Sequence, residues 1–483
     1  MKSNAIYIAL VAAILQLACK KLVQVPPPGT QLTSDNVYAT NATATSVLTG
    51  IYTVLPASSM QIGSTIDAIS LVSALSADEL ILDGGAANGN ALLVQFYRNA
   101  LTPGLATASS STIWSDIYSD IYIANVAIER LGISTGLTFA VRQQLTGEAK
   151  FLRAFFYFYL LNLYGNVPLV TKSNYAGNAF APVASAGLVY NQIISDLSDA
   201  QKLLTDNYVG PDALSSTSER VRPNRWAAKA LLSRVYLYTK NWDSAKILSS
   251  EVIGNTGLYG LTVLNGAFLK NSREAIWQLQ PVNAGWNTED ARLFILPASG
   301  PTTNSAIGYP VYLSNELLSS FESGDQRKAH WVDSVIVSNS VYYYSYKYKS
   351  ASINAPITEY VMVLRLAEQY LIRAEAEANE GGSKINSAIA DLDTIRARAG
   401  LPNYSGGNDL VSLSAAILHE RQVELFTEWG HRWLDLKRTN GINKAMGMAE
   451  GYKGIAWRPE WQYYPIPLYD ITEDPNLVQN QGY

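Results

Sequence analysis

The sequence predicts a mainly α-helical protein, built from tetratricopeptide-like helix pairs with long irregular insertions and a few short strands. Apolar residues recur at helical spacing through several long segments, and some of these segments follow one another across very short turns. Two stretches, about 60–100 and 255–360, depart from that pattern and carry loops rich in Gly and Asn. Because stacked helix pairs bury a continuous core, they form a rigid scaffold that can hold such insertions.

The first group of helices is predicted between residues 111 and 254. Its helices cover 111–131, 141–164, 188–204, 224–240 and 242–253. The second of them is apolar on almost every side in its second half, which is typical of a buried helix. That helix ends at Gly165, and Pro168 follows, which is a common signal for a helix C-terminus. The last two helices form a tight hairpin around Asn241.

A second group of helices is predicted between residues 362 and 430, after the longer insertion. Its helices cover 362–380, 384–399 and 414–428, with Gly381 ending the first and Ser383 as the N-cap of the next. The insertion itself contains two strand-like runs. Ala275 to Gln280 is short and mostly apolar. From Val341 to Tyr348 the residues alternate, with Tyr342, Tyr344, Tyr346 and Tyr348 on one face of a strand and Tyr343 and Lys347 on the other.

The composition limits the kinds of partner and ligand that are expected for this protein. The chain has 483 residues, a net charge of −4 and no basic block, so a nucleic-acid partner is not expected. Charged residues make up only 16% of the chain, whereas it contains 30 Tyr and 10 Trp. An uncharged surface rich in aromatic rings suits neutral ligands such as sugars. A large core with Tyr at its edges would give the same composition.

The N-terminus has the layout of a lipoprotein signal peptide over residues 1–18. A positive residue and an apolar run, residues 5–17, precede Cys19, which is the single cysteine of the sequence. The run is too short to cross a bilayer as a helix. We predict that Cys19 is acylated and anchors the protein in a lipid bilayer. The alternative is an unmodified thiol near a cleavage site, and Gln16 stands where such signals usually have Leu. Residues 19–35 are rich in proline and are expected to form a semi-rigid tether.

No residue pattern identifies catalytic chemistry. His419-Glu420 begins like a zinc-protease motif, but Val423 occupies the position of the second His that the metal would need. We therefore expect no metal, no cofactor and no enzyme activity. Two adjacent carboxylate pairs, Asp78-Glu79 and Glu289-Asp290, keep a secreted glycoside hydrolase open as an alternative, since such an enzyme needs an acid and a nucleophile or base.

The densest group of charged residues lies between Glu420 and Arg438, near the end of the chain. Charged and apolar residues interleave there at helical spacing until Gly430 breaks the helix. A polar ligand site is one interpretation. We favour the other, a buried network in which Arg and Glu pair and fix the last helix against its neighbours.

The same segment resembles the hallmark of the SusD/RagB family of outer-membrane lipoproteins, which reads approximately ER-x-x-E-L-x-x-E-G-x-R-x-x-D-L-K-R. The matching residues are Glu420-Arg421, Glu424-Leu425, Glu428, Gly430, Arg432 and Asp435-Leu436-Lys437-Arg438, with Trp429 inserted before the glycine. Other segments are similar to the family as well: Ala18-Cys19, 153–169, 227–238, 365–376, 395–400 and 465–483. The resemblance therefore covers essentially the whole chain.

The resemblance implies a single SusD-like domain over residues 19–483, with helix pairs within 111–254 and 362–430 and ligand-binding insertions at about 60–100 and 255–360. It implies a surface-exposed protein of the outer membrane that binds a nutrient, expected to be a glycan, and delivers it to a SusC-like TonB-dependent transporter barrel, which it covers as a lid. It brings no catalytic residues. Besides the hydrolase, a peptide-binding repeat scaffold remains an alternative, because the sequence does not identify the ligand.

The family motifs belong to the scaffold, so candidate ligand contacts follow from residue chemistry. Aromatic rings pack on the C–H faces of sugars, while Asn and Asp bind the hydroxyl groups. Trp286 is the main candidate, because it lies between Asn283 and Asn287 in a polar loop, although burial beneath that loop would explain it as well. The weaker candidates are Tyr309, Asp83 and Asn88.

Overall fold

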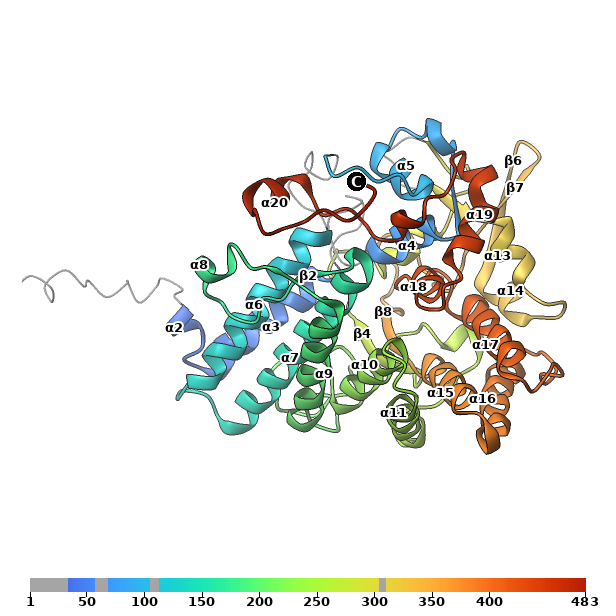
Figure 1. Ribbon diagram of the computed structural model, residues 1–483. Coiled ribbons are helices and arrows are strands. Elements are labelled where there is room, and N and C mark those ends of the chain that lie inside the picture. Colours follow the sequence, from blue (N-terminus) through green and yellow to red (C-terminus); the bar gives the residue numbers. More distant parts are fainter. Residues whose placement is uncertain (1–33, 57–67, 105–112, 304–309) are drawn as a thin grey trace, which may run out of the picture.

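The computed structural model describes residues 34–56, 68–104, 113–303 and 310–483. Long helices form a continuous stack that runs across the lower part of Figure 1. They are α6 (Ile113–Ile133), α7 (Phe139–Tyr164), α9 (Ala186–Leu203), α10 (Arg225–Tyr238), α11 (Trp242–Gly254), α15 (Leu366–Glu380), α16 (Ile385–Arg398) and α17 (Leu410–Leu425). α7 packs between α6 and α9, α10 between α9 and α11, and α15 contacts α11, α16 and α17. The predicted mainly helical fold is confirmed.

α7 forms the centre of the core. Every residue from Phe151 to Leu161 is buried, as the apolar sequence of this helix predicts. The ring of Phe155 packs edge to face against both Trp277 and Trp429, with centroids 5.1 and 5.6 Å apart. The helix ends at Gly165, as predicted, where φ is +79° and a Cβ would lie 3.3 Å from Cδ1 of Tyr463. Glycine therefore serves both the backbone turn and the close approach of the C-terminal segment.

The N-terminal helices pack onto this core and onto the C-terminal part of the chain. α3 (Asn41–Val54) lies against α6 and α7, and the hydroxyl of Tyr52 donates to Oε2 of Glu148 at 2.9 Å. All the residues of α4 (Ile69–Ser76) are buried, between α5 (Ala91–Arg98) and α18 (His431–Arg438). Residues from both ends of the sequence therefore share one core.

Among the described residues, the strands form four two-stranded antiparallel sheets. The pairs are β1 (Leu80–Leu82) with β5 (Val311–Leu313), β2 (Val167–Pro168) with β3 (Val183–Ala184), β4 (Ala275–Leu279) with β8 (Val361–Arg365), and β6 (Val332–Val337) with β7 (Ser340–Ser345). The strand predicted at 275–280 is confirmed as β4. The strand predicted at 341–348 is confirmed as β7, which ends three residues earlier, at Ser345. The β1–β5 pair joins the first predicted insertion to the second.

Two local predictions in the second helical group were wrong. Residues Met362 to Arg365 belong to strand β8 and not to the following helix, because they pair with β4, which lies far away in the sequence. The β-branched residues Val361 and Val363 favour this strand. Ser383 does not cap α16, since it lies inside the 3-10 turn η5 (Gly382–Lys384) that precedes the helix.

The charged segment near the C-terminus is a buried ion-pair network, as favoured from the sequence. Glu424 of α17 pairs with Arg365 at 2.5 Å, with Arg327 at 3.0 Å and also with Arg398. α17 ends at Leu425, three residues before the predicted end, so Gly430 does not break it. Gly430 instead precedes α18 as its N-cap, where φ is +73° and a Cβ would lie 2.8 Å from Oγ of Ser73 on α4. The hallmark residues therefore fix α17 and α18 against the rest of the core.

Shorter elements complete the described structure. They are α2 (Ser34–Val37), α8 (Tyr175–Asn178), α12 (Glu289–Phe294), α13 (Asn315–Ser320), α14 (Gln326–Trp331), α19 (Ile442–Lys453) and α20 (Leu468–Glu473), with the 3-10 turns η2 (Gly85–Ala87), η4 (Leu264–Gly266) and η6 (Pro459–Gln462). In the part of the chain that the structure describes, no helix combines the length and the apolar character needed to pass through a bilayer. The predicted signal peptide, Cys19 and most of the tether lie outside the described residues.

Candidate ligand-binding site

The first loop that carries predicted site residues follows β1. The N–H of Asp83 donates to the carbonyl of Pro310 at 2.7 Å, which extends the pairing of β1 with β5 by one step. Asn88 is buried, and its side chain donates to the carbonyl of Asp83 at 2.8 Å and accepts from the N–H of Asn90 at 2.9 Å. The hydrogen bonds of Asn88 thus fix the conformation of the loop. The side chain of Asp83, at the first residue of this loop, is partly exposed.

Tyr312 lies close to Asp83 and packs against a second tyrosine, Tyr342. Tyr312 on β5 and Tyr342 on β7 meet edge to face, with ring centroids 5.1 Å apart, and both side chains are partly exposed. β5 contacts both β1 and β7, which brings the loop after β1 next to Tyr312. The β6–β7 hairpin and α5 lie on the upper side of the helical stack (Figure 1).

The charge of Asp83 influences the ionisation of Tyr312. Burial raises the pKa of Asp83 above its usual value, and a hydrogen bond from the N–H of Gly84 opposes this effect. Burial also raises the pKa of Tyr312, and the negative charge of Asp83 raises it further. The two residues offer a phenol O–H donor and a carboxyl acceptor beside an aromatic face. This combination can bind the hydroxyl groups and the C–H face of a sugar.

The second loop, which connects β4 to α12, carries Trp286. Its partly buried ring lies beneath the guanidinium of Arg292, whose Cζ is 4.3 Å from the ring centroid. Arg292 in turn donates from Nη1 to both carboxylate oxygens of Glu289 at 2.9 Å. A stacked guanidinium orients the ring and is worth about 0.5–1 kcal/mol at such a site. Trp286 is therefore part of a defined surface cluster and not of the core.

The two asparagines beside Trp286 have structural partners. Asn283 donates to Oε1 of Glu289 at 2.5 Å. Asn287 is buried, donates to Oγ of Ser350 at 2.9 Å and to the carbonyl of Pro356 at 3.1 Å, and accepts two backbone N–H groups from residues 358 and 359. All the bonding groups of the Asn287 amide are used, so this side chain ties the loop to the segment 350–359.

The structure thus groups the predicted residues into two clusters. Asp83 and Asn88 share the first loop, while Asn283, Trp286 and Asn287 share the second. Tyr309 lies outside the described residues. The sequence did not identify Tyr312, Tyr342 or Arg292 as members of these clusters. The alternation of tyrosines in β7 was the one available signal for Tyr342, whereas Tyr312 depends on a strand pairing between distant segments.

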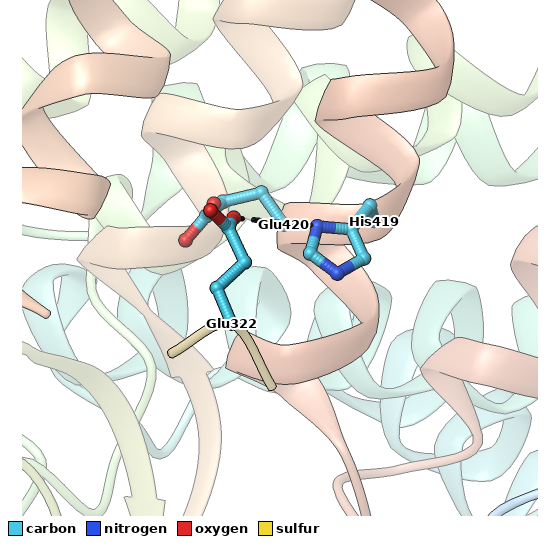
Figure 2. A group of neighbouring side chains, drawn as sticks. All are labelled: Glu322, His419 and Glu420. Atoms are coloured by element: carbon cyan, nitrogen blue, oxygen red, sulfur yellow. Dashed lines mark ion pairs between the residues drawn. The ribbon is translucent and has the colours of Figure 1, made fainter. Parts of the chain in front are cut away.

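Among the described residues, one group of side chains has the composition of a metal site, and Figure 2 shows it. Glu322, His419 and Glu420 bring ligand-type atoms within 4.8 Å of one another. Both carboxylates are already held by guanidinium groups, Glu322 by Arg396 at 2.6 Å and Glu420 by Arg327 at 2.5 Å. Nε2 of His419 donates to the carbonyl of Ser320 at 2.7 Å. Arginine charges therefore already balance this cluster, which argues against a dication there.

The adjacent carboxylate pairs do not form an exposed acid–base pair. Asp78 accepts hydrogen bonds of 2.8 and 2.6 Å from Arg432, and Glu79 is fully buried. Burial, together with the charge of Asp78, raises the pKa of Glu79 to about 8. Burial likewise raises the pKa of Asp290 to about 7, with a contribution from Glu428. These carboxyl groups belong to the core and its ion pairs, so they do not support hydrolase chemistry.

Two protein-family models match the chain. The SusD family model matches residues 332–483, and a model described as starch-binding, associating with the outer membrane, matches residues 69–237. SusD-like protein P2 of Formosa agariphila is 25% identical over 434 residues, which are 80% of this chain and 83% of that protein. The starch-binding protein SusD of Bacteroides thetaiotaomicron is 31% identical over 134 residues, 26% of this chain and 21% of that protein. This chain belongs to the SusD/RagB family.

Solved structures of SusD-like proteins share the fold. A laminarin-binding SusD-like protein has a TM-score of 0.72 and 25% identity, and the match covers 91% of this chain and 99% of that one. A SusD superfamily protein from Bacteroides vulgatus has a TM-score of 0.77 and 20% identity, over 92% and 100% of the two chains. The SusD-like fold is confirmed. The family consists of binding proteins and not of enzymes, as predicted, and it is associated with the outer membrane.

Proposed function

We propose that this SusD-like protein is a surface-exposed lipoprotein that binds a glycan nutrient, expected to be an oligosaccharide, and delivers it to a SusC-like TonB-dependent transporter. The arrangement that carries the proposal is the partly exposed tyrosine pair, Tyr312 and Tyr342, beside the carboxyl group of Asp83. Rings and a hydrogen-bonding carboxyl group are the chemistry that a neutral sugar requires. The names of similar proteins, which refer to starch, laminarin and surface glycans, support the same ligand class.

Within this proposal, residues 19–483 form one domain in which different segments have different roles. The helices within 111–254 and 362–430 are the scaffold, and the insertions at about 60–100 and 255–360 bind the ligand. Asp83 belongs to the first insertion, and Tyr312 belongs to the second. The pairing of β1 with β5 supports a joint site, because it holds parts of both insertions together.

The proposed transporter contact follows from family membership and from the placement of the loops. A rigid stack that carries its loops on one side can cover the mouth of a barrel. The test is co-purification: a tagged copy of this chain, expressed in its native host, should isolate a TonB-dependent barrel from solubilised outer membranes. Isolation of the chain without any barrel would contradict the transporter role while leaving ligand binding untouched.

The proposed lipid anchor depends on Cys19, which directly follows the apolar run of the N-terminus. Several acyl chains on one cysteine hold a protein far more firmly than one chain does. Cys19→Ala should therefore release the protein from outer membranes, measured by fractionation in a strain that lacks the proposed transporter. Retention of the variant in that strain after a high-salt wash would contradict a lipid anchor at Cys19.

The binding function is tested by titrating the purified chain with a panel of neutral oligosaccharides that includes laminari- and malto-oligosaccharides. Calorimetry should show saturable binding of at least one member, and chromatography should recover that sugar intact after prolonged incubation. Release of shorter products would favour the glycoside hydrolase. Saturable binding of a peptide pool without binding of any sugar would favour the peptide-binding scaffold.

A further inference from the structure

A pocket lies beside β2, where the helices α6, α8 and α20 meet. It contains about 910 Å³ of empty space, part of it open to solvent. α8 and α20 lie in the left half of Figure 1, whereas the β6–β7 hairpin lies at the right. None of the described lining residues belongs to the loops around Asp83 and Trp286, so the pocket is separate from the proposed glycan site.

Aromatic rings form one wall of this pocket. Trp114, Tyr118 and Tyr122 follow one another at intervals of four residues along α6, so they lie on one face of the helix. The rings of Trp114 and Tyr118 pack together with their centroids 4.9 Å apart. Tyr175, the first residue of α8, adds a further ring. Tyr122 is 47% exposed and Tyr175 is 82% exposed, so both rings can contact a ligand.

Carboxylates form the other wall. They belong to Asp470 and Glu473 on α20 and to Asp474, which directly follows that helix. No Lys, Arg or His is among the described residues that line the pocket, and these three carboxylates form no ion pair within the described part of the chain. The internal segments outside the described residues, 57–67, 105–112 and 304–309, contain no Lys, Arg or His either. The pocket therefore holds negative charge that the described residues do not compensate.

Two of these carboxylates are buried acceptors beside the aromatic wall. Asp474 is only 8% exposed, and its Oδ1 accepts from the N–H of Asn476 at 2.9 Å, whereas its Oδ2 accepts no hydrogen bond from a described residue. A buried polar atom normally has a partner, so a donor in the pocket would complete this carboxylate. Burial raises the pKa of Asp470, and hydrogen bonds from its own N–H and from the Trp114 side chain oppose this effect. Burial also raises the pKa of Tyr118, with a contribution from the charge of Asp470.

The spacing of the carboxylates favours an organic cation over a metal ion. Among the described residues, Glu322, His419 and Glu420 form a group whose ligand-type atoms lie within 4.8 Å of one another, and the three carboxylates of this pocket form no such group. A dication requires several ligands that converge on one point. An ammonium group instead donates in several directions and is attracted to the faces of aromatic rings. It therefore suits carboxylates that are spread along an aromatic wall.

We propose that this pocket is a second ligand-binding site, which takes a small organic cation that carries a protonated amine. Asp470 and Asp474 accept the N–H groups of the ammonium, and the exposed rings of Tyr122 and Tyr175 contact its carbon skeleton. Ionised carboxylates only accept hydrogen bonds and an ammonium group only donates them, so the two match each other. A neutral ligand would leave the negative charge of the pocket uncompensated.

The test is calorimetric titration of the full chain at about pH 6.5, where free amines are protonated. The ligands are glucosamine, its neutral counterpart N-acetylglucosamine, and putrescine, which is an amine without a sugar ring. Asp470→Asn and Asp474→Asn each remove one negative charge, and an Asn side chain keeps the oxygen that accepts a backbone N–H. Their control is Asp243→Asn, the same change at an exposed position of α11. Tyr175→Ala is paired with Phe139→Ala, because both remove an exposed ring at the first residue of a helix.

We expect both amines to bind the unmodified chain. Each aspartate variant should weaken glucosamine binding by about tenfold or more and Tyr175→Ala by about threefold or more, while both controls leave it unchanged. Putrescine binding at least as tightly as glucosamine would support a site for simple amines, and tighter glucosamine binding would support a site for amino sugars. Thermal unfolding checks the fold of each variant. The proposal would be overturned if neither amine bound, if the folded aspartate variants bound glucosamine like the unmodified chain, or if Asp470→Asn weakened N-acetylglucosamine binding as much as glucosamine binding.

Discussion

Nη1 of Arg365, at the end of β8, donates to Oε1 of Glu424 on α17 at 2.5 Å, and neither side chain is more than 2% exposed. Burial alone would raise the pKa of Glu424, but the charges of Arg398, Arg365 and Arg327 hold it well below its usual value. One carboxylate thus contacts three guanidinium groups that come from different segments of the fold, and other buried carboxylates complete the charge balance: Glu274, Glu420, Glu428 and Asp325. In this chain the charged residues of the hallmark therefore hold buried segments together.

Glu424→Gln should destabilise the protein strongly. The substitution removes the one counter-charge that three buried arginines share, and breaking such a buried pair from one side costs about 3–5 kcal/mol. Urea unfolding followed by circular dichroism measures the change. The matched control is Glu251→Gln, which removes an exposed ion pair with Lys229 and should cost at most about 1 kcal/mol. Similar costs for the two variants would contradict a structural role for the network.

Gly430→Ala should destabilise the protein because the residue has φ +73° and its new Cβ would lie 2.8 Å from Oγ of Ser73. Backbone strain of this kind costs about 1–3 kcal/mol. Gly447→Ala is the control: Gly447 lies inside α19 with open space around its Cβ position, and Ala there should stabilise by about 0.5–1 kcal/mol. The two free energies of unfolding should therefore change in opposite directions. A neutral Gly430→Ala would show that the turn after α17 is not fixed as described.

Glu79 should make stability depend on pH. Burial raises its folded-state pKa to about 8, so between the usual value near 4.5 and pH 8 the folded chain keeps a proton that the unfolded chain releases. The stability that protonated Glu79 contributes to the folded state is fully present below pH 4.5 and is lost as the pH rises through about 8. Glu79→Gln does not titrate, so its stability relative to the unmodified chain should increase by a few kcal/mol between pH 5 and 8.5. A difference that stays constant with pH would show that Glu79 is ionised throughout.

Trp286→Ala should weaken binding of whichever oligosaccharide the unmodified chain binds, if the second loop belongs to the site. The ring is partly exposed and packed against Arg292, so its loss should change the loop surface and leave the core intact. Affinity is measured by calorimetry, and near-ultraviolet circular dichroism checks the fold. Unchanged affinity in a folded variant would remove Trp286 from the site and leave the first loop as the ligand-binding part.

The scaffold was predictable because its signals are local. The apolar character of α7 and its end at Gly165 depend only on residues that are neighbours in the chain. The turn at Asn241 is also local, because the Asn241 side chain accepts a hydrogen bond from the N–H of Ser244. Strand β8 was missed because its partner β4 is distant in the sequence. A periodicity argument cannot distinguish a short apolar strand from the first turn of a helix that follows it.

The candidate site was less predictable for the same physical reason. Trp286 and Asp83 were identified from loop composition, which is local. Tyr312 became part of the site only through the pairing of β1 with β5 and its contact with Tyr342. The composition of a polar loop also does not distinguish an asparagine that binds ligand from one that binds backbone, and Asn287 uses its whole amide for the loop.

The most direct measurement for the central claim is the affinity of Tyr312→Ala for the oligosaccharide that the unmodified chain binds most tightly, determined by calorimetry. Phe139→Ala, which removes an exposed ring at the start of α7, is the matched control. A glycan site beside Asp83 predicts that Tyr312→Ala loses about tenfold or more in affinity, or about 1.4 kcal/mol, while Phe139→Ala binds like the unmodified chain. Equal affinity of a folded Tyr312→Ala and the unmodified chain would contradict the site.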